Sequence, residues 1–491
     1  MKRILFLIGL LATTGCSDLL NKEPLAALSV SSAYATPSDA LRALTAAYNP
    51  LLNFPGYDGY SIYDIVADNA EKGGEGPSDA SYFNEIAYYA IPTSNTVALQ
   101  VWRNCYLGVY RSNLVLENVP GIEMDATESA RILAEAKFLR AYYYFTLVTF
   151  YGDVPLITKS DIQTFDAERT PKEQVYALIE KDMAEASEIL PLRSKLPAAE
   201  MGRVTKGAAQ AYLGKVYLYK KDFQKAEVWF KKVMDSNEYS LDPDYYRPFT
   251  MAGEFGTENV FEINHMYSPQ YLTARNQASI RQGSAGMYGW GFANPTQDFV
   301  DAFEPGDPRL KLTVYKQGDI MPDGKVADVG NSETGYMSKK AYLLAGDFPA
   351  TGDPAHSGKN ELKMRYGMLL LWYAEAANEN GNTEPALAAL NLVRKRARQG
   401  VANVLPDVTV TTQNALREKI WQEERVEYGM ENHRYFDLIR QGRAGTVLRA
   451  YSAKYNSSKG KNFKDGTHEL FPIPQTEVDL SQGRLVQNKG Y

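Results

Sequence analysis

The sequence predicts a mostly α-helical protein in which paired helices form a scaffold and a loop-rich half carries a few short strands. Two observations support this fold class. Several segments repeat apolar residues at helical spacing and occur in pairs joined by short polar turns. The intervening segments 52–96, 239–358 and 443–491 are rich in Gly, Pro, Asn, Asp and Tyr and lack that periodicity. We therefore expect the helical scaffold mainly at 97–238 and 360–442.

The chain begins with a short apolar run that is typical of a secretory signal peptide. Two basic residues precede the run Ile4–Ala12, and small residues and then Cys16 follow it. The run is shorter than the about 20 residues that span a membrane, but it matches the apolar region of a signal peptide. A thiol at this junction accepts a diacylglycerol in bacterial lipoproteins, although Thr13 stands where their signals usually carry leucine. We expect a lipoprotein signal peptide at 1–15 and lipidation of Cys16, with an ordinary secretory signal as the alternative.

Two long segments in the first part of the scaffold carry signals of helix boundaries. The segment TESARILAEAKFLRAYYYFTLVTFYGD begins at a candidate cap, Thr127, and stops at Gly152. Its later part is apolar nearly all round, which predicts burial on several sides. The next helix begins with Thr170, Pro171 and Glu173, which predict a capping box with proline at a permitted position.

Two helix pairs resemble tetratricopeptide units. The segment 205–239 predicts two helices separated by the turn KKD, and Gly214 is a small residue that lets the helices approach closely. The segment LLLWYAEAANENGNTEPALAALNLVRKRARQG has the same arrangement, with Pro385 near the start of its second helix and Gly400 as a C-cap. The irregular spacing between pairs predicts a scaffold interrupted by long insertions rather than a regular solenoid. Within the insertions, NVFEINH at 259–265 predicts a short strand.

Composition and charge exclude several functions. The chain has 53 basic and 59 acidic residues, and loss of Lys2 and Arg3 with the signal peptide shifts its net charge from −6 to about −8. A negative chain does not favour nucleic-acid binding, which requires a basic face. Cys105 is the one cysteine besides Cys16, so we expect no disulfide within the chain.

The sequence shows no motif for catalysis or metal binding. Dinucleotide, P-loop, zinc-protease and nucleophile-elbow patterns are missing, and the four histidines lack the spacing of metal ligands. The stretch ERVEYGMENHRYFDLIRQGR alternates charges, which predicts an ion-pair network that locks helices together, with His433 as a structural, hydrogen-bonded residue. We therefore expect no enzyme activity, no catalytic residue, no cofactor and no metal.

Aromatic residues are frequent in the loop-rich segments, interleaved with Asp, Asn and Arg. Aromatic rings cover the apolar face of a sugar, and carboxylates, amides and guanidinium groups bind its hydroxyl rim. We place Trp290 first as a stacking platform, because Gly289 and Gly291 on either side predict a mobile backbone and a poorly shielded ring. The alternative for each aromatic residue is burial in the core, which we expect for Trp102. The other candidate ligand-binding residues are Tyr288, Tyr82, Phe83, Asp68, Asn69 and Tyr336.

Eight stretches of the chain carry a resemblance to a known family. They are CSDLLNKEPL; VWRNCYLGVYRSNLVLENV; AEAKFLRAYYYFTLVTFYGDVPLIT; GRVTKGAAQAYLGKVYLY; PTQDFVDAFEPGDPR; LLLWYAEAANENGN with ALAALNLVRKRA; EERVEYGMENHRYFDLIRQGR; and LFPIPQTEVDL. Together and in this order they resemble the SusD/RagB family, the surface lipoproteins of Bacteroidetes that capture nutrients, mostly glycans. The resemblance covers nearly the whole chain.

The resemblance implies a single SusD-like domain over 16–491, with tetratricopeptide-like helices packed on a ligand-binding half. It implies a lipoprotein anchored in the outer membrane and facing the exterior, which binds glycans without catalysis. Its partner would be a SusC-like TonB-dependent transporter, which it covers like a lid and to which it passes the oligosaccharide. Asp18 also resembles the signal that directs such lipoproteins to the cell surface. The family's shared stretches are scaffold, so no ligand contact transfers, although GWGFANPT matches a family pattern that favours Trp290.

Three functions remain open at this point. The first is a glycan-binding protein of the cell surface, the second is a surface receptor for peptides taken up by the same kind of transporter, and the third is a glycoside hydrolase. Aromatic clefts bind both glycans and peptides, so they do not separate the first two functions. A hydrolase needs two carboxyl groups across the bond, and among 59 acidic residues some pair is always present. The net charge slightly disfavours acidic glycans, although a local arginine cluster would override it.

Overall fold

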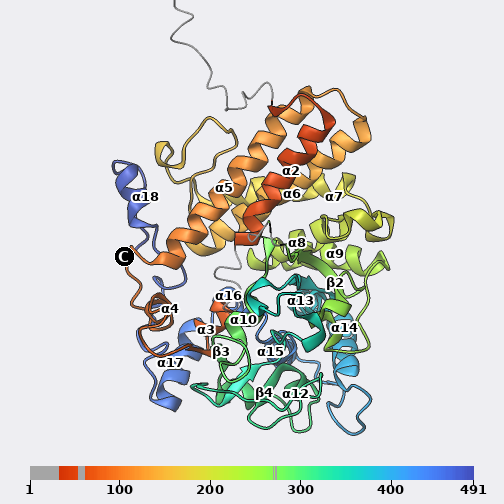
Figure 1. Ribbon diagram of the computed structural model, residues 1–491, viewed down its shortest axis with the longest axis vertical. Helices are drawn as coiled ribbons and strands as arrows, with labels where there is room; N and C mark the ends of the chain where they lie inside the picture. Colours follow the sequence, from red (N-terminus) through yellow and green to blue (C-terminus); the bar gives the residue numbers. More distant parts are fainter. Residues whose placement is uncertain (1–32, 54–60, 269, 271–273) are drawn as a thin grey trace, which may run out of the picture.

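The computed structural model describes residues 33–53, 61–268, 270 and 274–491. The predicted signal peptide at 1–15 and the predicted lipidation site Cys16 lie outside these residues. Helices dominate the described chain, and its strands form three antiparallel pairs, β1 with β3, β2 with β6 and β4 with β5 (Figure 1). The prediction of a mostly α-helical fold is confirmed.

The described helices are α2 (Pro37–Asn53), α3 (Ile62–Ile65), α4 (Tyr82–Ala87), α5 (Thr96–Asn118), α6 (Ala126–Tyr151), α7 (Lys172–Ile189), α8 (Lys206–Tyr219), α9 (Phe223–Asp235), α10 (Ala278–Gln282), α11 (Gln297–Val300), α12 (Arg309–Thr313), α13 (Tyr366–Glu379), α14 (Thr383–Ala397), α15 (Gln413–Glu427), α16 (Arg434–Arg440), α17 (Ala444–Tyr455) and α18 (Gln475–Leu480). The strands are β1 (Ala70–Gly73), β2 (Asn259–Ile263), β3 (Phe292–Pro295), β4 (Val314–Lys316), β5 (Tyr336–Ser338) and β6 (Glu361–Arg365). In the described part of the chain, no helix is both long enough and apolar enough to cross a membrane.

The long helices α2, α5, α6 and α7 lie together at one end of the molecule, and the short strands lie toward the other end (Figure 1). Helices α8 and α9 form the first predicted pair, and α13 and α14 form the second. A Cβ atom on Gly214 would lie 2.7 Å from the ring of Phe230, so glycine permits the close approach of α8 and α9. The expected role of Gly214 is therefore confirmed.

Two predicted helix starts differ from the structure. Helix α6 is capped by Asp125, whose carboxylate accepts the N–H groups of Thr127 and Glu128, so its cap lies two residues before the predicted one, Thr127. The predicted capping box at Thr170 is wrong. Its backbone pairs instead with Val154, at 3.0 and 3.3 Å, which holds Thr170 extended outside α7.

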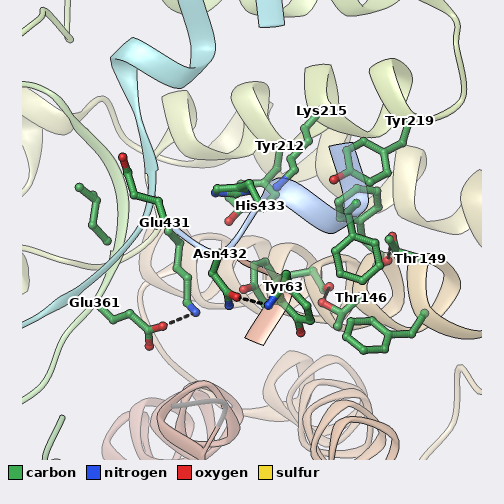
Figure 2. Close-up of a pocket in the computed structure, with 16 residues that line it drawn as sticks. Tyr63, Thr146, Thr149, Tyr212, Lys215, Tyr219, Glu361, Glu431, Asn432 and His433 are labelled. Carbon is green, nitrogen blue, oxygen red and sulfur yellow. Dashed lines mark hydrogen bonds and ion pairs between the residues drawn. The ribbon is translucent and has the colours of Figure 1, made fainter. Parts of the chain in front are cut away.

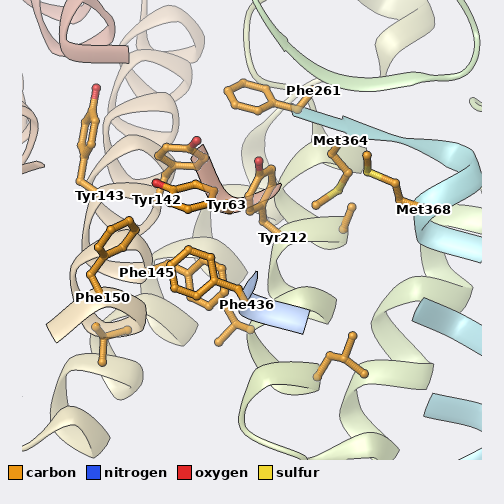
Figure 3. Packing of buried hydrophobic residues seen from close by; sticks show 14 of the residues in the cluster. Tyr63, Tyr142, Tyr143, Phe145, Phe150, Tyr212, Phe261, Met364, Met368 and Phe436 are labelled. Carbon is orange, nitrogen blue, oxygen red and sulfur yellow. The ribbon is translucent and has the colours of Figure 1, made fainter. Parts of the chain in front are cut away.

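The core is unusually rich in tyrosine, and α6 is its centre. Phe150 of α6 packs with Tyr63 and Phe436 at ring centroid distances of 5.5 and 5.0 Å (Figure 3). A buried tyrosine needs a partner for its hydroxyl group, and the Tyr143 hydroxyl donates a 2.8 Å hydrogen bond to the Ala47 carbonyl of α2. Trp102 is buried in this core, as predicted. The abundance of tyrosine is thus explained largely by packing.

The loop-rich segments contain the predicted strand, several helices of four to six residues and one longer helix, α17, that we did not expect. The stretch 259–265 begins with β2, which pairs with β6, so the prediction of a strand is confirmed. The segment 443–491 opens with the 12-residue helix α17. Leu448 and Tyr451 of this helix are buried, and three positions along a helix bring them onto one face. A single apolar pair within a polar segment was too weak a periodic signal to predict it.

Candidate ligand-binding face

Strands β1 and β3 form a two-stranded ribbon that positions the predicted stacking residue. Their register pairs Glu71 with Asn294 and Gly73 with Phe292. Gly73 has a φ of +70°, and a Cβ atom there would lie 2.1 Å from the carbonyl oxygen of Gly291. Glycine is therefore required at position 73. This position is the end of β1, and it lies against Gly291, the residue that follows Trp290.

Trp290 lies at the end of a tight turn before β3, and its side chain is 39% exposed. The Trp290 N–H donates to the Ile280 carbonyl oxygen (2.7 Å), and the Gly291 N–H donates to Gly283 (2.8 Å). A Cβ atom on Gly289 would lie 2.1 Å from the Gly283 carbonyl oxygen. The expected exposure of the ring is therefore present, but the glycines serve close packing. Hydrogen bonds hold the backbone that we predicted to be mobile.

A second exposed aromatic residue and two carboxylates lie along the same ribbon. Tyr88 follows α4 and is 38% exposed. Partial burial and the nearby carboxylates of Glu71 and Glu333 raise the pKa of Tyr88, which places all three side chains in one neighbourhood. Glu71 is held by a 2.6 Å hydrogen bond from the Tyr451 hydroxyl. We use the name ribbon face for Tyr88, Glu71 and Glu333 together with Trp290, which stands beside the end of the same ribbon. Its aromatic rings and carboxylates are the two kinds of group that bind the face and the rim of a sugar.

The prediction did not single out Tyr88, although two tyrosines stand side by side there. Tyr89 is 3% exposed, and its hydroxyl donates to the Val66 carbonyl oxygen at 2.8 Å. Adjacent residues often point to opposite sides of the backbone, so one of two neighbouring tyrosines is expected at the surface. No sequence signal indicates which one.

Three of the predicted aromatic ligand residues pack against neighbouring rings, and of these only Phe83 is buried, because Tyr82 and Tyr288 are half-buried. Phe83 is 0% exposed, so it lies out of reach of any ligand. Tyr82 packs edge-on against it, with a centroid distance of 4.6 Å. Tyr288 packs against Tyr342 and Phe348, and its hydroxyl oxygen accepts the Leu343 N–H at 2.7 Å. Tyr82 and Tyr288 thus remain candidates for ligand contact, and Phe83 does not.

Tyr336 lies at the start of β5, and β5 lies next to β3. Its ring is half-buried, and its hydroxyl group donates a 2.9 Å hydrogen bond to Gln297. It remains a candidate for contact with a ligand at the border of the ribbon face.

Asp68 and Asn69 are buried and hold the start of β1 to the C-terminal helices. The Asp68 carboxylate accepts two hydrogen bonds from Arg434, at 2.7 and 3.0 Å, and lies 3.0 Å from Arg425. Burial favours the neutral acid, but the two guanidinium groups outweigh it and hold the pKa of Asp68 below its usual range. Asn69 accepts a 3.0 Å hydrogen bond from Arg425. Both residues thus act in the scaffold, where we had expected ligand contacts.

The charged stretch before α17 forms the predicted ion-pair network. Arg440 contacts Glu375, Glu424 and Asp437, and so joins α13, α15 and α16. Burial and the neighbouring Glu375 carboxylate raise the pKa of Glu424 well above its usual value. The network connects helices that are distant in sequence, as expected of one that locks helices together. His433 packs edge-on against the rings of Trp372 and Tyr428, at 5.8 and 5.6 Å.

A pocket lies between α6, α8, α16 and β6 (Figure 2). Its volume is about 110 Å³, and Tyr63 is fixed on its wall by a 2.8 Å hydrogen bond from its N–H to Asn432. Ligand pockets usually measure roughly 300–1,000 Å³, so this pocket is too small for an oligosaccharide. A neighbouring pocket of about 640 Å³ is large enough, and Tyr176, Tyr219 and Phe436 contribute aromatic rings to it.

Comparison with known proteins places this architecture in a family. The model of the SusD family matches residues 227–491, and a model described as "Starch-binding associating with outer membrane" matches residues 64–218. SusD-like protein P2 of Formosa agariphila is 27% identical over 100% of this chain and 99% of its own length.

Solved structures have the same fold. A laminarin-binding SusD-like protein is 27% identical, with a TM-score of 0.80 over 93% of this chain and 100% of that one. Surface glycan-binding protein A of Bacteroides thetaiotaomicron, solved with laminarihexaose, is 24% identical, with a TM-score of 0.79 over 92% of this chain and 99% of that one. The SusD family model alone covers more than half of the sequence, and the fold of the described residues agrees with it. This chain belongs to the SusD family.

Proposed function

We propose that this protein is a cell-surface glycan-binding lipoprotein that captures oligosaccharides and delivers them, without catalysis, to a TonB-dependent transporter. The observation that carries the proposal is its likeness, over nearly the whole chain, to a laminarin-binding member of the same family. The match to a family described as starch-binding and associated with the outer membrane supports both the ligand class and the location. Lipidation of Cys16, exposure to the exterior and the SusC-like partner are parts of this proposal.

We place the glycan on the ribbon face. Trp290 presents an exposed ring on a backbone fixed by hydrogen bonds, so little conformational entropy is lost when a sugar stacks on it. Glu71 and Glu333 offer acceptors for sugar hydroxyl groups beside the exposed ring of Tyr88. A rigid aromatic surface with neighbouring acceptors is suited to binding and does not require a reactive group.

A peptide receptor is the alternative that the sequence left open. The descriptions of the matched family and of the solved relatives above name starch, laminarin and glycans. We therefore propose glycans as the ligand class and use peptides as a comparison in the test.

The test is calorimetry on residues 17–491, produced without the lipid, against laminarin, starch, acidic polysaccharides and mixed peptides. Trp290→Ala is the test variant, and Tyr110→Ala is its matched control, because Tyr110 is an equally exposed aromatic residue on helix α5. Loss of a central aromatic contact typically costs about 2 kcal/mol, or about 30-fold in affinity.

We expect one glycan class to bind, Trp290→Ala to weaken that binding by about 30-fold, and Tyr110→Ala to leave it unchanged. If binding survives Trp290→Ala, the glycan binds at another surface, and the 640 Å³ pocket near Tyr219 becomes the next candidate site. Binding of peptides and of no glycan would refute the proposed function.

A further inference from the structure

A pocket of about 430 Å³ lies between α15 and α17, close to the ribbon face. Tyr451 belongs to both places, because it lines the pocket and its hydroxyl donates to Glu71 of β1 at 2.6 Å. This volume falls within the range of ligand pockets and accommodates one or two sugar units. Four cationic and three acidic side chains line the pocket, so its walls carry a net charge of about +1 within a negative protein.

Most of these charges are already paired. Asp68 receives two hydrogen bonds from Arg434. Asp298 accepts hydrogen bonds from Arg425 at 2.9 Å and from Lys454 at 2.8 Å. Arginine side chains that are held in this way have little capacity left for a ligand, whereas the Lys454 side chain is 54% exposed and is less constrained.

Arg443 differs from the other two arginines of the pocket, Arg425 and Arg434. Its guanidinium group stacks on the ring of Trp421, 4.7 Å from the centroid, and its side chain is 21% exposed. The carboxylate that comes nearest, Glu418, is 3.8 Å away and 70% exposed, which is beyond hydrogen-bonding distance. Its Nε atom is fully buried, and no acceptor for it exists among the described residues. This atom has no exposed surface, so a ligand can reach only the exposed part of the Arg443 side chain.

The electrostatic surroundings of Arg443 favour an added negative charge. Burial and the neighbouring Arg434 guanidinium lower the pKa of Arg443 to about 10. The side chain thus remains charged at neutral pH, but its cationic form is less well stabilised than that of a free arginine. The acidic groups nearby, Glu418, Asp68 and Glu424, oppose this effect only in part.

We propose that Arg443 forms a subsite for an anionic substituent, a carboxylate or a sulfate ester, on the glycan that this protein captures. A guanidinium group presents parallel N–H donors that match the oxygens of such groups. Stacking on Trp421 fixes the plane of the guanidinium before the ligand arrives. The inference rests on the proposed glycan-binding function and narrows its ligand class to acidic glycans, which the net charge of the whole chain would disfavour.

Calorimetry with matched oligosaccharides tests the subsite. The ligands are one neutral oligosaccharide, its uronic-acid counterpart and its sulfated counterpart, each measured at low and high salt. The test variants are Arg443→Gln, which removes the charge, and Arg443→Lys, which keeps the charge but removes the planar group. The control is Arg449→Gln on the same helix, because Arg449 pairs with Asp465 and does not line the pocket.

We expect an acidic ligand to bind wild-type protein, Arg443→Gln to weaken this binding by about ten-fold or more, and Arg443→Lys to restore it only in part. The affinity for the neutral ligand should be the same in the Arg443 variants as in wild type. Arg449→Gln should bind the acidic ligand with wild-type affinity. A preference for the uronic acid or for the sulfate ester identifies which anion the subsite binds. Equal binding of acidic ligands by wild type and Arg443→Gln would overturn the inference.

A second measurement separates failure of the subsite from failure of the proposed function. The Nε–H signal of Arg443, assigned by its loss in Arg443→Gln, is followed by NMR in arginine-labelled protein during titration with glucuronate and with glucose 6-sulfate. A shift of this signal supports the subsite even if no polysaccharide binds. If neither compound shifts it at millimolar concentration, the inference is wrong.

Discussion

Replacement of Arg440 by methionine tests how the scaffold is held together. The Arg440 guanidinium is buried and contacts Glu375, Glu424 at 3.2 Å and Asp437 at 2.8 Å. Methionine has a similar length but no charge, so it fills the space while leaving three buried carboxylates without this partner. The free energy of unfolding should therefore fall substantially, even though the volume of the side chain is kept.

The expected loss follows from the cost of an uncompensated buried charge. Breaking one buried ion pair typically costs about 3–5 kcal/mol, and contributions within one network do not add. We therefore expect Arg440→Met to lower the free energy of unfolding by about 3–5 kcal/mol near neutral pH, measured by urea denaturation with circular dichroism. The control is Arg449→Met. Arg449 lies 2.9 Å from Asp465, which is largely exposed, so this substitution should lower the free energy of unfolding by less than about 1 kcal/mol.

The loss should also depend on pH. Burial and the Glu375 carboxylate already raise the pKa of Glu424, and removal of Arg440 raises it further. A carboxyl group whose pKa is higher in the folded than in the unfolded state destabilises the fold above its unfolded pKa of about 4.3, and this cost shrinks as the pH falls through the folded pKa. The deficit of Arg440→Met should thus be smaller at pH 5 than at pH 7. A deficit below about 1 kcal/mol, or one equal at both pH values, would refute this reasoning.

Two further outcomes follow from the backbone and from a buried histidine. Gly73→Ala should lower the free energy of unfolding by about 2 kcal/mol or more, because alanine is strained at a φ of +70° and its Cβ meets the Gly291 carbonyl oxygen. Gly346→Ala, where a Cβ meets open space, should be neutral in the same urea titration. Burial and the nearby Lys215 lower the pKa of His433, so its contribution to stability is lost as the pH falls below about 6.5. His433→Gln should therefore lose less stability than wild type between pH 7 and pH 5, and an unchanged slope would contradict this assignment.

The helical scaffold could be predicted because its signals are local. Gly214 and the helix pairs at 205–239 and 366–397 follow from spacing within a few turns, and the structure confirms them. Errors arose where a distant segment decided the outcome. Thr170 has the sequence of a helix cap, but pairing with Val154 keeps it outside the helix.

The candidate ligand-binding residues were predicted less well, because their residue types are common in cores. Trp290 is exposed as expected, whereas Phe83 is buried and Tyr288 is half-buried against Tyr342. Asp68 has the chemistry of a sugar ligand, yet Arg434, 366 residues away in sequence, uses both of its oxygens. Composition indicates which groups can bind a glycan, but it does not indicate which of them are already engaged.

The sequence by itself determined the fold class, the paired helices and the family, because apolar periodicity and motif order are properties of neighbouring residues. The tertiary structure alone decided which aromatic rings reach the surface and which charges are paired. Tyr88 is exposed and Tyr89 is buried, and the Nε atom of Arg443 has no acceptor among the described residues, while Arg434 donates two hydrogen bonds to Asp68. The physical reason is that burial and hydrogen bonding depend on contacts between segments that lie hundreds of residues apart, and no local pattern records them.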